Sequence, residues 1–498
     1  MTIGAIISRI VLSLLTSAIW MLSFPDYDQG WLAWIALVPL IFACRNLSGI
    51  AAVAIGFLSG FASTWAVFYW IFEVSGFRIH HMAIGALYFG LYPALWCAGI
   101  PFLRMSRIPV FITIPGLWVA LDYLKAHAGF LAFPWGTLAH SQHNHLAFLQ
   151  IATITGEYGP TFLLVMANVA VADLIIFHRR AWKKAIMSGI IIGLAGLWGG
   201  LTLSRPMPST PLRVAVIQPS ILLSDRESPA GYASSINRME RLTLTAAQAH
   251  PALIAWPETA VRDLAKDPNL ILRLRRLSET TQTALIVGAS DYTKFTHPGK
   301  TVFETRQYNA AYFIESGKPP GAPYRKQILV PFGEYLPLES LITWPTWLIP
   351  RSFRVVPGDE SKIFQLTDGT RFSVIICWEN LFAPYVRQMI KDGAQLVVHL
   401  SNDNWFGPTA APRQHNLASV LRAIENRAPI LIASNTGPSE IIDSYGRIKG
   451  RQPGLFTQGI VGAEIELSPP KKTFYTRQGD LFAWGRLCSP VSVLSKVS

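Results

Sequence analysis

Seven long apolar runs separated by short polar loops fill the first two hundred residues, and they constrain the fold more than any other feature. Each run is close to the ~20 residues that an α-helix needs to cross a bilayer. Helices in the core of a soluble protein would instead carry apolar stripes beside a polar face. The sequence therefore predicts membrane-spanning helices over residues 5–23, 31–49, 51–72, 83–103, 109–126, 157–177 and 185–203.

Length and composition agree with a chain of two different parts. The chain has 498 residues, which is longer than a single hydrophobic core usually grows. Charged residues make up only 15% of it, whereas soluble domains contain roughly 25%. The first apolar run is followed by no small-residue cleavage site, so we expect a retained helix rather than a signal peptide.

Basic residues are distributed unequally between alternate loops of this half. The loops after the second, fourth and sixth runs contain Arg45, then Arg104 and Arg107, then Arg179, Arg180, Lys183 and Lys184. The opposite loops contain only Arg78, and Lys125 lies at the outer end of the fifth run. Because basic loops stay in the cytoplasm, we expect a cytoplasmic N-terminus and an extracytoplasmic second domain.

Three functional classes are disfavoured by composition and spacing. The net charge of +13 is not accompanied by a basic repeat or an RNA-binding motif, so a nucleic-acid partner is not expected. Cys377 is the lone cysteine of the second domain, apart from Cys488 near the end, which excludes a disulfide framework and a zinc cluster. Irregular spacing also argues against a metal site at the histidines of the first half, His127, His140, His143 and His145.

The pattern changes after residues 205–211, a proline-containing segment that we interpret as a linker. Short apolar runs then alternate with helical segments, which indicates a sheet covered by helices over residues 212–470. We expect strands at 212–218, 253–256, 284–288, 310–314, 372–376, 396–400 and 430–433, and helices at about 230–250, 263–282, 380–392 and 412–427. Residues 1–204 form the predicted membrane domain, and 471–498 form a C-terminal segment that either contains a short or degenerate last membrane helix or does not cross the membrane.

Three reactive side chains lie where predicted strands end. Glu258 follows Pro257, Lys326 lies on an irregular segment, and Cys377 lies between an apolar strand and the start of an expected helix. A helix N-terminus would lower the pKa of the thiol. A lone cysteine on an apolar strand is more often an inert core residue. The joint occurrence of a thiol, a carboxylate and an amine at strand ends favours one catalytic site.

These residues give the sequence a family resemblance. It resembles the nitrilase superfamily, whose Glu-Lys-Cys triad is matched by Glu258, Lys326 and Cys377. The wider pattern is similar to the apolipoprotein N-acyltransferase family, which joins such a domain to a multispan half. The supporting motifs are Phe133-Pro134-Trp135-Gly136, Gly156-Glu157-Tyr158-Gly159, Cys377-Trp378-Glu379, Ser401-Asn402-Asp403, Trp405-Phe406-Gly407 and Gln414-His415.

The resemblance implies an α-β-β-α sandwich and a two-step acyl transfer. Cys377 would take an acyl chain from a membrane phospholipid as a thioester, with Glu258 as base and Lys326 as the cationic partner. The acceptor would be the N-terminal diacylglyceryl cysteine of an apolipoprotein. No metal and no organic cofactor is implied. The expected location is a bacterial inner membrane, with the catalytic domain in the periplasm.

Secondary candidates surround this proposed triad. Glu334 and Glu379 would orient Lys326 or shape the pocket, or would form plain ion pairs; Trp378 is a further supporting residue. The apolar segment 341–353 would either enter the outer leaflet or pack as a lid. The candidate lipid-binding residues are Trp344, Trp347, Leu348, Trp405 and Phe406. For His415 we expect a structural hydrogen bond.

Two other functions share part of this pattern. A membrane-tethered carbon-nitrogen hydrolase would use the same triad with water as acceptor, although a tether needs only one helix. A transporter would need ionisable groups near the membrane centre. Arg9, Glu73, Asp122 and Lys125 fall near the ends of predicted spans, and Asp173 is the clearest exception.

Overall fold

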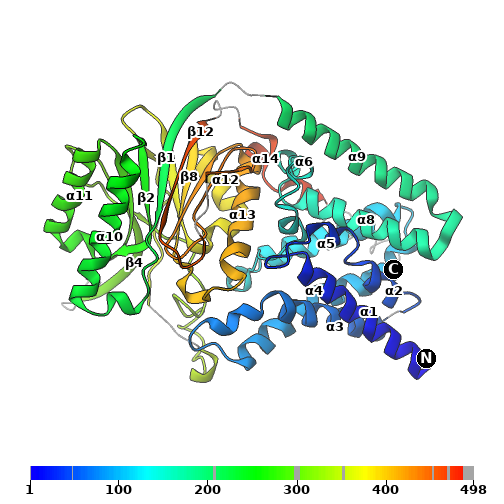
Figure 1. Ribbon diagram of the computed structural model, residues 1–498. Helices are drawn as coiled ribbons and strands as arrows, with labels where there is room; N and C mark the ends of the chain where they lie inside the picture. Colours follow the sequence, from blue (N-terminus) through cyan, green and yellow to red (C-terminus); the bar gives the residue numbers. More distant parts are fainter. Residues whose placement is uncertain are drawn as a thin grey trace. The chain divides into compact units, whose positions relative to one another are not determined.

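The computed structural model describes residues 2–47, 49–205, 209–296, 303–349, 354–450, 454–467 and 472–485. The chain divides into two compact units (Figure 1). Unit 1 comprises Met1–Pro206, Thr409–Leu417 and Thr473–Ser498, and unit 2 comprises Met207–Pro408 and Ala418–Lys472. Residues 409–417, which the sequence placed in the second domain, therefore group with the first unit.

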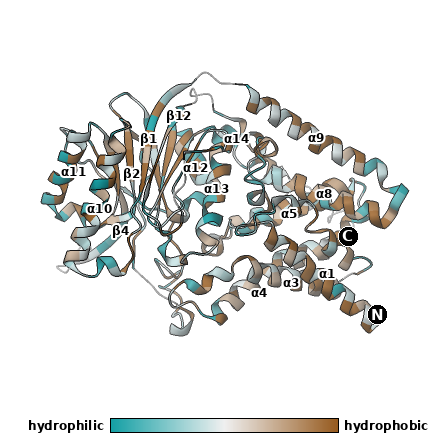
Figure 2. Ribbon diagram, viewed as in Figure 1, coloured by the Kyte–Doolittle hydropathy of each residue, from teal (hydrophilic) through white to brown (hydrophobic). Residues whose placement is uncertain are grey.

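Unit 1 is built on long apolar helices. Within the described residues, five are long and apolar enough to cross a membrane: α1 (Ile3–Leu22), α3 (Gly49–Val67), α4 (Ile79–Arg104), Tyr158–Arg180, which contains α8 (Tyr158–Phe177), and α9 (Trp182–Ser204). Large apolar side chains such as Ile7, Leu194 and Leu197 point outward from α1 and α9. Both helices are accordingly brown over much of their length in Figure 2. Side chains of this kind need lipid as solvent, so the protein is a multi-pass membrane protein.

Two of the expected spans differ from the sequence prediction. Instead of one helix over 31–49, the chain forms η1 (Gly30–Trp34) and α2 (Val38–Ala43), with Pro39 in the first turn of α2. Asn168 of α8 stabilises the break, because it donates to the carbonyl of Ala33 and accepts from the N–H of Leu37. The expected helix over 51–72 ends at Val67, and η2 (Tyr69–Glu73) follows it. The span expected at 109–126 is α5 (Val110–Ala126), a helix of 17 residues.

Short helices connect the long helices of unit 1, and one more lies in its C-terminal part. They are η3 (Gly129–Leu131), η4 (Leu138–Gln142), α6 (Leu146–Leu149), α7 (Ala152–Thr155), η5 (His178–Arg180) and α14 (Phe474–Gln478). Residues 481–485 are helical. The remainder of the possible last span, from residue 486 onward, lies outside the described residues.

Unit 2 contains two six-stranded sheets. The first has the order β12-β1-β2-β3-β4-β5 and the second the order β11-β10-β9-β8-β7-β6. The strands of the first are β1 (Thr210–Gln218), β2 (Leu253–Val261), β3 (Ala284–Thr296), β4 (Phe303–Ile314), β5 (Tyr324–Arg325) and β12 (Gly459–Leu467). Those of the second are β6 (Phe364–Gln365), β7 (Arg371–Ile376), β8 (Leu396–Ser401), β9 (Ile430–Ser434), β10 (Glu440–Ile442) and β11 (Ile448–Lys449).

Helices cover the outer faces of the two sheets, as the α-β-β-α class requires. The first sheet shares a hydrophobic core with α10 (Pro229–Ala247) and α11 (Pro268–Thr281). Strands β1 and β2 contact β8 or β9, so the sheets pack face to face. Figure 1 shows α12 (Ala383–Lys391) and α13 (Ala411–Asn426) beside the second sheet. The fold is the α/β sandwich that the sequence predicts.

Strand β12 is absent from the sequence prediction. It pairs antiparallel with β1 along nine residues, from Thr210 opposite Leu467 to Gln218 opposite Gly459. Strand β1 also begins inside the expected linker 205–211. The central strands β1, β2 and β3 are parallel, as are β7, β8 and β9. Carboxyl ends of parallel strands meet at one edge of a sheet, and this is where Glu258 and Cys377 lie.

Candidate active site

Glu258 lies in an irregular part of β2. The register with β3 shifts between Trp256 and Val261, Pro257 has no N–H to donate, and Thr259 has a φ of 47°. A Cβ on Gly288 of β3 would lie 2.1 Å from the carbonyl oxygen of Pro257. Only glycine lets β3 approach the backbone that carries Glu258 so closely.

The carboxyl group of Glu258 is buried, with 7% of the residue exposed. The side-chain amide of Asn309 donates to its Oε1 at 2.6 Å. Burial raises the pKa of Glu258 to about 7, and the nearby Lys326 ammonium and the Asn309 hydrogen bond oppose this rise. Such a carboxyl group exchanges its proton near neutral pH, which suits a general base.

Lys326 follows β5 and is 1% exposed. Its backbone N–H donates to the carbonyl oxygen of Asn309 at 2.8 Å, and its own carbonyl accepts from Gly358. Its Nζ lies 2.9 Å from each carboxylate oxygen of Glu334. Burial by itself lowers the pKa of Lys326, but Glu334, Cys377 and Glu258 together raise it above its ordinary value. The side chain is therefore a permanent ammonium ion.

Cys377 is the first residue after β7 and opens η9 (Cys377–Leu381) with a φ of 54°. The ring Nε2 of His399 lies 2.8 Å from its carbonyl oxygen. Burial and the Glu258 carboxylate raise the pKa of the thiol, although Lys326 lowers it. The expectation of a lowered thiol pKa is thus wrong, because one short 3-10 helix does not offset burial beside carboxylates. A thiol of this kind becomes a nucleophile only after a base has taken its proton.

Glu379 joins the segment of Lys326 to the turn at Cys377. Its Oε1 accepts from the backbone N–H groups of Gln327 and Ile328 at 2.8 and 3.0 Å. Its Oε2 accepts from the Tyr324 hydroxyl at 2.6 Å and from the N–H of Ile376 at 2.7 Å. One buried carboxylate therefore fixes the backbone on both sides of the site.

Trp378 ties the same two segments together. Its indole Nε1 donates to the carbonyl oxygen of Ile328 at 2.7 Å, and its ring packs edge-on against Phe382 at 5.2 Å between centroids. The side chain is buried. Glu379 and Trp378 thus belong to one rigid frame around the thiol.

The structure brings the three sequence-predicted residues together. Cys377 and Glu258 each shift the pKa of Lys326, and Glu258 and Lys326 each shift that of Cys377. The charge of Asp403, which begins η10 (Asp403–Phe406), also raises the pKa of both Glu258 and Cys377. A thiol, a base with a pKa near neutrality and a fixed cation in one buried place can form and stabilise a tetrahedral acyl intermediate.

Sequence reasoning missed the residue that holds Glu258. Asn309 lies in β4 one residue before the apolar run that we read as a strand, and it contacts both Glu258 and the backbone of Lys326. The sequence signal that could have pointed to Asn309 is a single amide side chain directly before an apolar strand. Tyr324 and Tyr385, whose hydroxyls lie 2.8 Å apart next to Glu379, were also not singled out.

The aromatic segment is only partly exposed. Trp344 donates from its indole to the carbonyl oxygen of Pro337 at 2.6 Å and packs edge-on against Phe332. Trp347 is 59% exposed and Leu341 is 80% exposed, whereas Leu348 is half-buried. Residues 350–353 of this segment lie outside the described residues. Trp344 therefore packs on unit 2 itself, and Leu341 and Trp347 form the apolar outer surface.

The remaining candidates have separate positions. Trp405 and Phe406 lie in η10, half-buried, two and three residues after Asp403. His415 belongs to unit 1, where its ring stacks on Trp135 at 5.2 Å between centroids. Across the part of the chain that the structure describes, no group of three or more His, Cys, Asp and Glu side chains is arranged to hold a metal ion.

Comparison with known proteins gives matches over both units. Residues 16–170 match the model of the apolipoprotein N-acyltransferase N-terminal domain, and residues 213–471 match the carbon-nitrogen hydrolase model. A protein of Geobacter metallireducens named apolipoprotein N-acyltransferase is 32% identical over 95% of this chain and 92% of its own length. A protein of the same name from Thermotoga maritima is 27% identical over 95% of this chain and 90% of its own length.

Among solved structures, a mutant of a Nesterenkonia amidase from the nitrilase superfamily covers 55% of this chain and 95% of its own, at 18% identity and a TM-score of 0.38. The two family models and the relatives cover nearly the whole sequence. The chain belongs to the apolipoprotein N-acyltransferase family and is an acyltransferase.

Proposed function

We propose that this enzyme transfers an acyl chain from a membrane phospholipid to the N-terminal diacylglyceryl cysteine of an apolipoprotein. The relatives that match along nearly their full length carry the name of this activity. The observation that carries the mechanism is the shared location of the Cys377 thiol, the Glu258 carboxyl group and the Lys326 ammonium, each of which acts on the charge of another.

In the first step the carboxylate of Glu258 takes the proton of the Cys377 thiol. The thiolate attacks the ester carbonyl of the phospholipid, and the negative charge that develops on oxygen is stabilised by Lys326 and by the backbone N–H of Trp378. Such a donor is commonly worth ~3–4 kcal/mol. The ester C–O bond then breaks, the lysophospholipid leaves with the proton from Glu258, and a thioester remains on Cys377.

In the second step the α-amine of the diacylglyceryl cysteine attacks the thioester carbonyl. Glu258 accepts the proton of the amine, and Lys326 again faces the oxyanion. The C–S bond then breaks, and Glu258 returns the proton to the sulfur of Cys377, which gives an amide and the free thiol. Neither step, as written, requires a metal ion or an organic cofactor. Glu334 supports both steps by holding Lys326 through two oxygens at 2.9 Å.

We further propose that the enzyme lies in a bacterial inner membrane with unit 2 in the periplasm. The basic loops around Arg45, Arg104 and Arg179 support a cytoplasmic side that includes the C-terminal end of α4. Asp173, the ionisable residue that looked most deeply placed in the sequence, pairs with Arg104 at 2.7 Å. Because Asp173 is neutralised by a residue at the end of α4, it does not support a transport pathway through the membrane.

The direct test is intact-mass spectrometry of the purified enzyme after incubation with phospholipid. The expected adduct equals one acyl chain and is absent from Cys377→Ala. Addition of a diacylglyceryl peptide with a free α-amine should discharge the adduct much faster than water does. An adduct that water removes at the same rate with or without the peptide would identify a hydrolase instead, and no adduct on the wild-type protein would reject the mechanism.

A further inference from the structure

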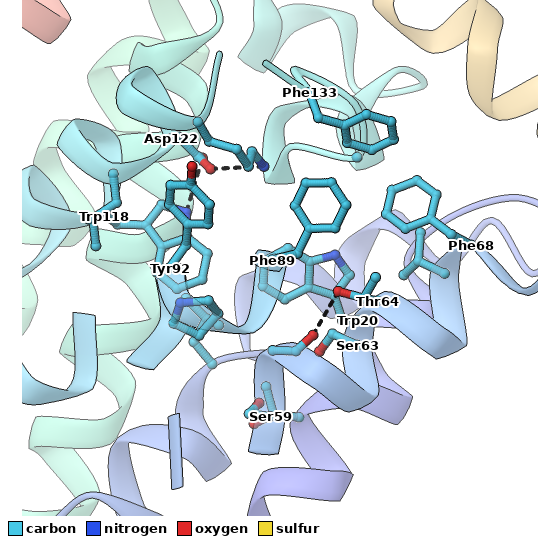
Figure 3. Close-up of a pocket in the computed structure, with 18 of the residues that line it drawn as sticks. Trp20, Ser59, Ser63, Thr64, Phe68, Phe89, Tyr92, Trp118, Asp122 and Phe133 are labelled. Carbon is cyan, nitrogen blue, oxygen red and sulfur yellow. Dashed lines mark hydrogen bonds and ion pairs between the residues drawn. The ribbon is translucent and has the colours of Figure 1, made fainter. Parts of the chain in front are cut away.

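Buried polar groups outside the proposed triad differ in what holds them. Asp122 lines a cavity of unit 1, where the Nζ of Lys125 lies 3.3 Å from its Oδ1 and the indole of Trp118 donates to its Oδ2 at 3.1 Å (Figure 3). All three residues belong to α5, so contacts within one helix account for this buried carboxylate. His399 of unit 2 is a different case, because its partner lies in another segment, at Cys377.

His399 is an exception in a mainly apolar strand. The strand β8 has the sequence LVVHLS, and every residue of it is buried. It lies between β7 and β9, with His399 opposite Ile375 on one side and Ile432 on the other. A buried imidazole is costly unless its polar atoms are hydrogen-bonded. A histidine at this position therefore needs a specific partner.

That partner is the backbone carbonyl of Cys377. The ring Nε2 of His399 lies 2.8 Å from this oxygen, a normal hydrogen-bond length. A carbonyl oxygen can only accept, so Nε2 carries the proton and donates the hydrogen bond. Cys377 has a φ of 54°, a left-handed conformation that a residue other than glycine keeps only where its surroundings hold it. The bond from His399 is one of the contacts that hold it.

The same carbonyl belongs to the peptide group that ends in the N–H of Trp378. A peptide group is planar, and in the trans form its C=O and N–H point in opposite directions. A carbonyl fixed toward His399 therefore also fixes the direction of the Trp378 N–H, which points away from the imidazole. Trp378 is the second residue of η9, and the first N–H groups of a helix have no partner inside it. This N–H is thus suited to an acceptor outside the helix.

The hydrogen bond at the carbonyl also changes the polarity of the N–H. Peptide resonance moves electron density from nitrogen to oxygen, and a donor at the oxygen favours this shift. The N–H becomes a stronger donor, by roughly 10–30% for each such bond. Direction and polarity both act on the Trp378 N–H rather than on the transfer of the thiol proton.

We propose that His399 is a positioning residue for the oxyanion of acyl transfer. Through the carbonyl of Cys377 it aims and polarises the Trp378 N–H that meets the negative oxygen. The inference rests on the proposed function, because it requires an acyl group to pass through Cys377. The alternative is that His399 only stabilises the turn. The two roles differ in their consequences, since the turn carries the thiol as well as the N–H.

The test compares two reactions of the same thiol in the full-length enzyme. Acylation of Cys377 by a short-chain, water-soluble thioester passes through an oxyanion, whereas alkylation by iodoacetamide displaces iodide from a saturated carbon and forms none. Mass spectrometry of the peptide that contains Cys377 gives both rates. His399→Met has a similar length and no N–H, so it should slow acylation roughly 10–100-fold, less than the 10²–10³ for loss of a whole donor. Alkylation should remain nearly unchanged.

Further variants make the result specific. His399→Gln carries an amide N–H at about the reach of Nε2 and should restore most of the acylation rate. Ser373→Ala is the matched control, because Ser373 is buried in β7 and donates to the carbonyl oxygen of Lys362 at 2.8 Å, away from the peptide after Cys377. It should leave the ratio of the two rates unchanged. His399→Phe, which keeps a ring without a donor, replaces the Met variant if that variant melts below the assay temperature.

Equal slowing of acylation and alkylation in His399→Met would overturn the proposal and leave His399 as a support of the turn. Acylation at the wild-type rate would overturn it as well, and so would a Gln variant as slow as the Met variant. If the thioester acylates the wild type but phospholipid does not, the proposed function fails and the ratio still decides the role of His399. If phospholipid acylates the enzyme and the ratio stays constant, only the role of His399 fails.

Discussion

Both carboxylate oxygens of Glu334 lie 2.9 Å from the ammonium nitrogen of Lys326, and Glu334 also accepts from the backbone N–H of Val330 at 2.8 Å. Because Lys326 is almost fully buried, this carboxylate is its principal counter-charge. These contacts hold the Lys326 side chain in one orientation. The contribution of this ion pair to stability can be measured, because removal of one partner of a buried ion pair leaves the charge of the other uncompensated.

The first prediction concerns Glu334→Gln. The change should lower the free energy of unfolding by about 3–5 kcal/mol and should slow thioester formation, because the cation loses its fixed position. Glu339→Gln is the control, since Glu339 faces Arg354 at 3.8 Å with both side chains exposed. Such pairs contribute ~0–1 kcal/mol. Thermal unfolding and intact-mass kinetics measure both effects, and similar results for the two variants would show that Glu334 is only a surface ion pair.

The second prediction is a pH dependence of thioester formation. With a pKa of about 7, Glu258 is mostly protonated at pH 6 and mostly ionised at pH 8. The rate should rise roughly tenfold over this interval, because only the carboxylate accepts the thiol proton. Glu258→Gln should be slower by about 10²–10⁴ and should lack this rise. A wild-type profile without a step near neutrality would remove Glu258 from the role of base.

The third prediction concerns stability, which should decrease with rising pH while the rate of thioester formation increases. The pKa of Glu258 rises from 4.5 to about 7 on folding, so between these values the folded protein binds the proton more tightly than the unfolded chain. The free energy of unfolding therefore falls as pH rises, by about 3 kcal/mol in total, and the loss is complete above pH ~7.

Glu258→Gln has no such titration, so it isolates this contribution. Between pH 5 and pH 8 the melting temperature of the wild type should fall relative to that of the variant, by roughly 5–10 °C for a domain of this size. Differential scanning calorimetry or fluorimetry in detergent measures the difference. Parallel curves for the two proteins would mean that the carboxyl group is solvated in the folded state.

The sequence places two of the candidate site residues at strand ends because the central strands are continuous apolar runs. Glu258 and Cys377 follow such runs, and the covalent order of strand and polar residue is visible without coordinates. Contacts between residues that are far apart in the sequence are not visible in this way. Asn309 reaches Glu258 across 51 positions, and Glu379 reaches the backbone of Gln327 across 52.

Local signals also failed where tertiary contacts decide the outcome. The apolar run 31–49 is long enough to span a membrane, but Pro39 and the side chain of Asn168 favour two short helices. The thiol pKa of Cys377 depends on burial and on carboxylates from other segments, which spacing does not reveal. The short strand β11 has too few residues for a periodic pattern.

The last prediction concerns the exposed apolar surface of Leu341 and Trp347. We expect these two side chains to enter the lipid surface during loading, and burial of a large apolar side chain stabilises that state by roughly 1.5–3 kcal/mol. The double change to serine should slow acylation by phospholipid in vesicles at least tenfold. Acylation by a short-chain, water-soluble thioester should remain unchanged, because the double variant leaves Cys377 and its neighbours intact.

Trp344→Ser provides the contrasting case, because Trp344 packs on Phe332 and donates to the carbonyl of Pro337. Its loss removes internal contacts, so both substrates should be affected alike and the melting temperature should fall. The decisive quantity is the ratio of the two acylation rates in each variant. If the Leu341 and Trp347 double variant keeps the wild-type ratio, the exposed surface does not take part in lipid loading.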